Sequence, residues 1–281
     1  MSTPGNTRRE ADDEEVSPPR KVQRLEDSPQ FRANFPCWIE LQTPDVEKAI
    51  EFYGAIYSLD KTVVLAGTEN EYIRLTHDDQ EPVMGLFKKE GTGHFIVSFA
   101  VDNIEEMKTK VTELGGSTVH DVRTVADLGK VALVRDTTGV EFQLWEPLTF
   151  KGIHYEHQKT GLAWLELRSS DIEKSKDFYD KLFNFETHSH GEYHTFKQGE
   201  TSVGGLVQCS SNTWRPFFLV ENLEQVREKV VDHGGEDVSD IETTCRDRIQ
   251  QFTFKGVSGE KCGAFIYLDQ EEAAKNKPKT D

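Results

Sequence analysis

The sequence has little that would tie it to a membrane, to nucleic acid or to a structural metal. Only four of its 281 residues are cysteines; they form no CxxC pair and no metal-finger spacing, so we expect reduced thiols. It has no apolar leader and no apolar run long enough to span a bilayer. Basic residues are also scarce, since 33 Lys and Arg stand against 50 Asp and Glu, giving a formal net charge of −17. That charge disfavours binding to nucleic acid or to anionic lipid. We therefore expect a cytoplasmic protein.

Both ends of the sequence lack hydrophobic periodicity. Residues 1–34 are mainly Glu, Asp, Arg, Ser and Pro, and 271–281 are also polar, so both are expected to be disordered tails. Arg20, Lys21 and Arg24 form a short basic cluster, which leaves a nuclear location open beside the cytoplasmic one. An interaction protein recognised through its tails is one open functional class.

Between the tails the sequence repeats itself. The segment CWIELQTPDVEKAIEFYGAIYSLD returns as AWLELRSSDIEKSKDFYDKLFNFE, and VDNIEEMKTKVTELGG returns as VENLEQVREKVVDHGG. Four matched pairs in the first segment all lie 126 residues apart: Trp38 and Trp164, Glu40 and Glu166, Asp45 and Asp171, and Phe52-Tyr53 and Phe178-Tyr179. The repeat predicts two domains, 35–149 and 160–270, joined by a linker at 150–159.

Within each repeat, the pattern of one strand, one helix and three strands occurs twice in succession. On its first strand Ile39 and Leu41 alternate with polar or aromatic neighbours, which indicates one face under the helices and one concave face. Pro44 is expected in the first turn of the following helix, and Ser170-x-x-Glu173 is expected to cap the equivalent helix. The expected fold class is α+β, with each domain a pair of βαβββ modules.

Four motifs carry a resemblance to a known family: CWIEL…PD…FY, EYHTFKQGETSVGGL, WRPFFLVENLE and LGKVALVRDTTGVEFQLWEP. They resemble the vicinal oxygen chelate superfamily of glyoxalase I, extradiol dioxygenases, and bleomycin and fosfomycin resistance proteins. Within it, the chain is similar to tandem glyoxalase-like proteins of the 27-kDa mycobacterial antigen type, over about 230 of 281 residues. The resemblance implies an open eight-stranded barrel in each domain. It does not settle the chemistry, because this fold hosts isomerases, lyases, oxygenases and binding proteins.

The resemblance also implies where a metal would be held. Enzymes of the superfamily use His, Gln or Glu at one position on each of four strands. The corresponding positions are Trp38, Gly85, Ile96 and Gln143 in the first repeat, and Trp164, Gly205, Arg215 and approximately Ile266 in the second. Of these side chains only that of Gln143 can bind a metal ion. We therefore expect no metal and no other cofactor.

Strand alternation suggests what the first concave face contains instead. Trp38 and Glu40 should face it, and a glutamate beside an indole is a candidate general base because burial raises its pKa. His94 is an alternative acid or base on the same predicted face. Ser98 and Gln143 should bind the ligand, with Trp38 as a flat wall for an aromatic or planar molecule. Alternatively, Trp38 fills the barrel and Glu40 pairs with a neighbouring cation.

The second concave face carries a different set. Trp164 and Glu166 repeat the first pair, and Arg215 stands at a former metal position, where it could bind a carboxylate or phosphate. The alternative is an ion pair between Arg215 and Glu166 that closes this pocket.

We favour a metal-independent small-molecule protein, monomeric or homodimeric, that is either a binder or a lyase- or isomerase-type enzyme with Glu40 as base. A second hypothesis is a metal-dependent glyoxalase or dioxygenase relative with Glu40, His94 and Gln143 as displaced ligands. The tail-mediated interaction protein is the third.

Overall fold

The computed structural model describes residues 32–68, 71–77, 81–153, 161–244 and 248–268. The C-terminal tail, the cluster at Arg20, Lys21 and Arg24, and most of the predicted N-terminal tail and linker lie outside this part of the chain. None of the helices in these described ranges is long and apolar enough to cross a membrane.

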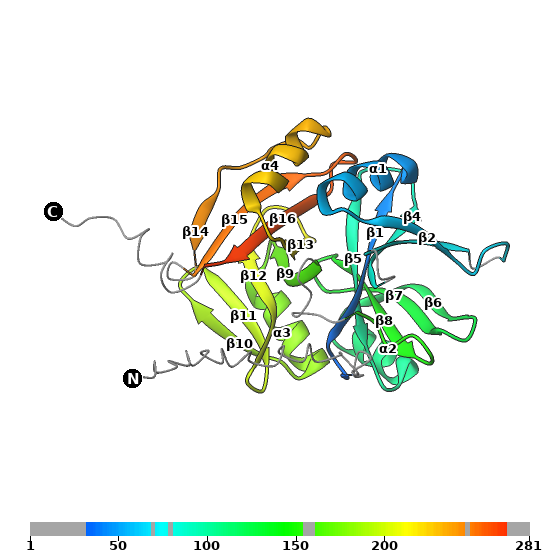
Figure 1. The fold of residues 1–281 in the computed structure, drawn as a ribbon. Coiled ribbons are helices and arrows are strands. Elements are labelled where there is room, and N and C mark those ends of the chain that lie inside the picture. The colour runs from blue at the N-terminus through cyan, green and yellow to red at the C-terminus, as the bar shows by residue number, and fades with distance from the viewer. Residues whose placement is uncertain (1–31, 69–70, 78–80, 154–160, 245–247, 269–281) are drawn as a thin grey trace, which may run out of the picture.

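Four βαβββ units follow one another along the chain (Figure 1). The first is β1 (Pro36–Thr43), α1 (Val46–Tyr57), β2 (Asp60–Val64), β3 (Tyr72–Thr76) and β4 (Pro82–Lys88). The second is β5 (His94–Ala100), α2 (Ile104–Glu113), β6 (Ser117–Val125), β7 (Gly129–Arg135) and β8 (Glu141–Pro147). The third is β9 (Gly161–Ser169), α3 (Ile172–Phe183), β10 (Glu186–His190), β11 (Tyr193–Gln198) and β12 (Thr201–Gln208). The fourth is β13 (Thr213–Leu219), α4 (Leu223–Asp232), β14 (Glu242–Thr244), β15 (Ile249–Lys255) and β16 (Lys261–Tyr267). The predicted α+β class is confirmed.

The strands form one 16-stranded sheet. In the first half of the molecule, made of the first two units, they are ordered β2-β3-β4-β1-β5-β8-β7-β6. In the second half they are ordered β10-β11-β12-β9-β13-β16-β15-β14, and a contact between β5 and β13 joins the halves. Within the described part of each half, the two outermost strands do not pair with each other, so the sheet is not closed. The division into tandem domains at 35–149 and 160–270 stays a prediction.

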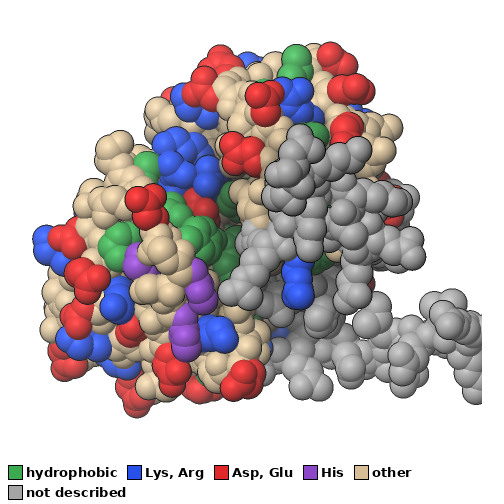
Figure 2. Space-filling model, turned by 90° about the vertical axis from the view of Figure 1, so that its left-hand side faces the viewer, with side chains coloured by type: hydrophobic (Ala, Val, Ile, Leu, Met, Phe, Trp, Pro, Cys, Tyr) green, Lys and Arg blue, Asp and Glu red, His purple; other side chains and the backbone are tan. Residues whose placement is uncertain are grey.

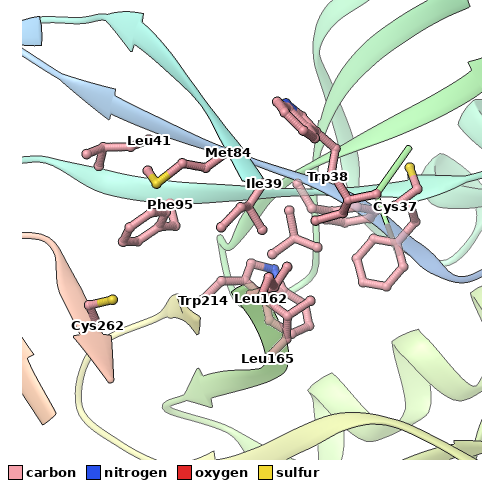
Figure 3. Packing of buried hydrophobic residues seen from close by; sticks show 14 of the residues in the cluster. Cys37, Trp38, Ile39, Leu41, Met84, Phe95, Leu162, Leu165, Trp214 and Cys262 are labelled. Atoms are coloured by element: carbon pink, nitrogen blue, oxygen red, sulfur yellow. The ribbon is translucent and has the colours of Figure 1, made fainter. Parts of the chain in front are cut away.

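One hydrophobic core runs through both halves. The ring of Tyr57 on α1 lies 4.6 Å from that of Phe218 in the second half, and Phe183 on α3 lies 4.5 Å from Phe99 in the first. Each half therefore packs a helix against the other, and burial of these aromatic faces stabilises the pair of halves together. Figure 3 shows Ile39 within this core, with Trp38 on the opposite side of β1, as the alternation predicted.

The helix α1 begins two residues later than predicted, and α3 begins one residue later. Their N-caps are Asp45 and Asp171, whose carboxylates accept backbone N–H bonds at 3.0 and 3.1 Å. Pro44 and Ser170 therefore precede the caps, and both predictions about them are wrong. An aspartate is as good an N-cap as a serine, so the pattern allowed either position.

The surface shows no large area of a single charge on the face seen in Figure 2. Acidic and basic side chains alternate there, with hydrophobic side chains visible in a hollow among them.

Candidate functional site

A cavity of about 520 Å³ lies in the first half and is lined by side chains from β1 and from strands on both sides of it. We call it the first-half cavity. Its walls combine aliphatic side chains with five aromatic rings, which are those of Trp38, Tyr72, Phe87, Trp145 and Phe150. Small-molecule sites in proteins typically have volumes of roughly 300–1,000 Å³ and apolar walls with a few polar groups. The first-half cavity has both features.

Four of the predicted site residues meet in this cavity: Trp38, Glu40, Ser98 and Gln143. Neighbouring strands hold them in register, because Trp38 pairs with Ser98 across β1 and β5, and Ser98 pairs with Gln143 across β5 and β8. The Ser98 hydroxyl donates a hydrogen bond to Gln143 Oε1 at 2.8 Å. The concave face predicted from strand alternation therefore contributes these groups to a single cavity.

His94 does not join them. It lies at the start of β5, four residues from Ser98, which is roughly 13 Å along a strand. The completely buried side chain of Ile96 lies between them on that strand. His94 lines a different cavity, of about 280 Å³, that Asn212 and other residues of the second half also line, and burial lowers its pKa. The structure thus does not bring His94 together with Glu40.

Glu40 lies in a hydrogen-bonded network at the wall of the first-half cavity. Its Oε2 accepts from the Tyr72 hydroxyl at 2.8 Å, and its Oε1 accepts from Gln42 Nε2 at 3.1 Å. The indole N–H of Trp38 in turn donates to the Tyr72 hydroxyl at 3.2 Å. Only 7% of Glu40 is exposed, and this burial raises the pKa of its carboxyl, while the two hydrogen bonds and the charge of Arg123 lower it. Burial prevails, so the carboxyl holds its proton more tightly than an exposed one.

Tyr72 was not among the predicted site residues. It projects from β3 over Gly85 of β4, and its hydroxyl lies in the space that a Cβ atom on Gly85 would occupy. Gly85 pairs with Glu40 on the parallel strand β1, so the Tyr72 hydroxyl that lies over Gly85 is also next to the Glu40 carboxyl. The sequence feature that could have indicated Tyr72 is that both repeats contain a tyrosine and a glycine at matching places. In the structure Tyr193 lies over Gly205 as Tyr72 lies over Gly85. A lone sequence does not show that this pairing has a structural cause.

The four positions that the resemblance assigned to a metal do not fit one. Trp38 is hydrogen-bonded to Tyr72, Gly85 has no side chain, Ile96 is apolar and buried, and the Gln143 oxygen accepts from Ser98. Throughout the described ranges, no group of three His, Cys, Asp or Glu side chains is placed to hold a metal. The displaced set of Glu40, His94 and Gln143 does not converge either, because His94 lies outside the first-half cavity.

The second half carries different side chains at the equivalent positions. In the first half, Ser98 pairs with Trp38 and with Gln143. In the second half, Phe217 pairs in the same way with Trp164 and with Gly263. Gly263 therefore corresponds to Gln143, the fourth position that the resemblance assigned to a metal ligand. The predicted position, Ile266, is wrong by three residues. The Phe217 ring lies over Gly263, where a Cβ atom would collide with it. Phenylalanine and glycine thus stand in the second half where the first half has serine and glutamine.

The charged residues of the second half pair with one another. Glu166 is 4% exposed, and its Oε1 accepts from Arg215 Nη2 at 2.5 Å and lies 3.5 Å from Arg168 Nη1. The Trp164 indole donates to the Tyr193 hydroxyl at 2.8 Å. The alternative in which Arg215 pairs with Glu166 is therefore the arrangement found in the structure.

Comparisons with known proteins point to one superfamily. Residues 161–262 match the family model described as the Glyoxalase/Bleomycin resistance protein/Dioxygenase superfamily. The chain is 24% identical over 227 residues to "Putative glyoxylase CFP32" of Mycobacterium tuberculosis, covering 75% of this chain and 87% of that protein. It is 22% identical over 243 residues to "Anthracycline biosynthesis protein DnrV" of Streptomyces peucetius, covering 78% and 88%. Its fold is similar to that of the Mn(II)-bound glyoxalase from Novosphingobium aromaticivorans, with a TM-score of 0.64, 11% identity, and 85% and 83% of the two chains covered.

Proposed function

Through residues 161–262 the chain belongs to the Glyoxalase/Bleomycin resistance protein/Dioxygenase superfamily, and from this premise we propose that it binds a small molecule in the first-half cavity without a metal ion. The observation that carries the proposal is the buried Glu40 carboxyl in the wall of that cavity, held by Tyr72 and Gln42. Burying a carboxyl costs folding free energy that hydrogen bonds only offset, and carboxyls with perturbed pKa values cluster in functional clefts, so the position of Glu40 favours a functional role.

The walls favour a planar ligand. Trp38 lines the cavity edge-on to Phe150, with ring centroids 5.4 Å apart, and Trp145 lies close to the same ring at 6.1 Å. Flat rings of this kind offer large apolar surfaces against which an aromatic or conjugated ligand can stack. Ser98 and Gln143 add a hydroxyl and an amide for orientation. DnrV, whose name places it in anthracycline biosynthesis, is a relative consistent with such a ligand.

The chemistry that this site offers is proton transfer of the lyase or isomerase type. Glu40 would take a proton from the bound ligand and return it to another atom, and its raised pKa makes it a better base than an exposed glutamate. The hydroxyl of Tyr72 would hold the carboxylate in position through the 2.8 Å hydrogen bond. A cytoplasmic location is part of the proposal and rests on composition.

Native mass spectrometry of the intact chain tests the proposal, because it detects a small molecule that remains bound after purification. That molecule is then assayed with Glu40→Gln and with Glu166→Gln, its matched change in the second half. We expect Glu40→Gln to fold normally and to lose turnover, and Glu166→Gln to keep both binding and turnover. The proposal is wrong if Glu166→Gln removes the ligand while Glu40→Gln is silent. A molecule that both proteins hold without turning it over identifies a binding protein.

A further inference from the structure

We propose that the ligand of the first-half cavity is a planar aromatic acid, with its anionic group bound by Arg74 and its opposite, hydrogen-bond-donating end at Glu40. The inference rests on the proposed function, because it concerns the same cavity. It adds the charge of the ligand and the residue that recognises this charge.

Arg74 is a cation without a counter-ion. It projects from β3 and lines the first-half cavity, and its Nε atom is buried. In the part of the chain that the structure describes, this atom donates no hydrogen bond and the guanidinium forms no ion pair. Burial lowers the pKa of Arg74, while Tyr72 raises it to a smaller extent. A buried N–H donor without an acceptor costs free energy, and a ligand carboxylate would supply that acceptor.

The nearby aromatic ring does not remove this need. The guanidinium carbon of Arg74 lies 6.0 Å from the centroid of Phe150, at the outer limit of a cation–π contact. Such a contact satisfies no N–H donor. A planar, forked guanidinium beside a ring is an arrangement that recognises the carboxylate of an aromatic acid, since the ring holds the body while the fork binds the acid.

The sheet register sets the distance between the two ends of the ligand. Glu40 pairs with Gly85, and Gly85 pairs with Arg74, so the three residues form a row across β1, β4 and β3. Strands lie about 4.8 Å apart, which separates the Glu40 and Arg74 backbones by roughly 10 Å. Gly85 has no side chain, and the Tyr72 ring lies over it, so a ligand that reaches from Arg74 to Glu40 would lie against this ring. A rigid ligand that bridges Glu40 and Arg74 needs its donor and its acid at opposite ends.

The charge of the cavity favours an anion over a cation. Arg74 and Arg123 line it, and the positive charge of Arg123 bears on Glu40. The other carboxylate in the lining, that of Glu71, accepts a hydrogen bond from the backbone N–H of Gly67 at 2.8 Å. Arg74 brings a positive charge to the cavity, and within the described residues this charge forms no ion pair, although the whole chain carries −17. An acidic ligand would neutralise it.

Calorimetric titration with matched probes tests the inference. The probes are 6-hydroxy-2-naphthoate and neutral 2-naphthol, with 4-hydroxybenzoate and phenol as a one-ring pair. They are titrated into the wild type, Arg74→Gln, Arg74→Lys and Arg227→Gln. Arg227 is a matched control because it lies on α4 and donates to Ser239 rather than into the cavity. Far-UV circular dichroism checks that each variant is folded.

We expect at least one acid to bind the wild type about 10-fold or more tightly than its neutral partner, as a charged hydrogen bond would give. Arg74→Gln should remove that advantage and leave the neutral probe unchanged, Arg74→Lys should keep part of it, and Arg227→Gln should have no effect. If the neutral probe binds as tightly as its acid, or if Arg74→Gln and Arg74→Lys bind the acid like the wild type, the inference is wrong and the proposed function stands. If no probe of either charge binds, the inference is wrong, and native mass spectrometry decides the proposed function separately.

Discussion

The hydroxyl of Tyr72 lies in the space that a side chain on Gly85 would fill. From there it donates to the Glu40 carboxylate at 2.8 Å, so the glycine, the tyrosine and the glutamate depend on one another. The superfamily resemblance assigned position 85 to a metal ligand, and here a tyrosine from the neighbouring strand reaches that place instead. Tyr193 lies over Gly205 in the same relationship in the second half. We propose that this tyrosine–glutamate pair serves a ligand site that needs no metal ion.

Alanine at Gly85 should disrupt the site directly. Its Cβ atom would collide with Tyr72, and overpacking of this kind costs roughly 1–3 kcal/mol of unfolding free energy. We expect Gly85→Ala to be destabilised by about that amount in urea titrations and to lose affinity for the ligand of the first-half cavity. Gly205→Ala is the control, since it collides with Tyr193 and should cost similar stability while leaving binding intact. Equal binding losses in the two variants would contradict the assignment of the site to the first half.

The pH dependence of stability should reveal the buried state of Glu40. Burial raises its folded pKa above the ordinary value of 4.5, so the folded protein binds more protons than the unfolded chain between those two pKa values. Its contribution to stability is therefore present below about pH 4.5 and is lost as pH rises through the folded pKa. Glu40→Gln removes this loss, so the variant should gain stability relative to wild type as pH rises. A difference that is constant with pH, measured by urea unfolding, would show that the carboxyl is not held protonated.

Glu166→Gln should destabilise the second half. The change leaves Arg215 and Arg168 without the carboxylate that both approach, at 2.5 and 3.5 Å. Breaking a buried pair costs roughly 3–5 kcal/mol, and these arginines are partly exposed, so we expect a loss of about 2 kcal/mol. The double variant Glu166→Gln, Arg215→Met should recover part of that loss, because no unpaired charge remains at position 215. If the double variant is less stable than the single one, the pair is not the source of the effect.

The strand pattern predicted some of these features and missed others for identifiable reasons. Trp38 and Glu40 alternate with core residues, so their common face was visible in the sequence. His94 and Ser98 face the same side of the sheet, because they are four residues apart on β5, but His94 lies at the start of the strand. Alternation along a strand predicts which face a side chain is on and not how far along the strand it lies. Ile266 was chosen across a loop that differs in length between the repeats, and only strand pairing identifies Gly263 instead.

The hydrogen bonds around Glu40 could not be predicted from a single sequence. Tyr72 and Glu40 are 32 residues apart, and nothing in their spacing shows that β3 and β1 lie on either side of β4. The core shared by the halves was missed for the same reason. Tyr57 and Tyr179 belong to amphipathic helices whose apolar faces were expected to cover their own sheets, yet both also contact rings of the other half.

Cys209 should be the most readily alkylated of the three cysteines that the structure describes. Burial raises its pKa, but hydrogen bonds from Ser211 and from Arg168, whose Nη2 lies 2.9 Å from Sγ, bring it down to about 7. Burial raises the pKa of Cys37 and Cys262 far above the usual range. Iodoacetamide labelling, followed by peptide mass spectrometry, should give a midpoint near pH 7 for Cys209 and no labelling of the other two in the folded protein. A midpoint near 8.5, unchanged in Arg168→Gln, would contradict this.

The most direct test of the central claim is calorimetric titration of the cavity ligand in excess EDTA, comparing wild type with the double variant Ser98→Phe, Gln143→Gly. These changes give the first half the phenylalanine and glycine that the second half has at Phe217 and Gly263, and the phenylalanine ring is expected to occupy part of the cavity. Our account predicts one ligand per wild-type chain, with an affinity that EDTA does not alter, and no binding by the folded double variant. Loss of binding in EDTA, or retained binding by the filled variant, would contradict it.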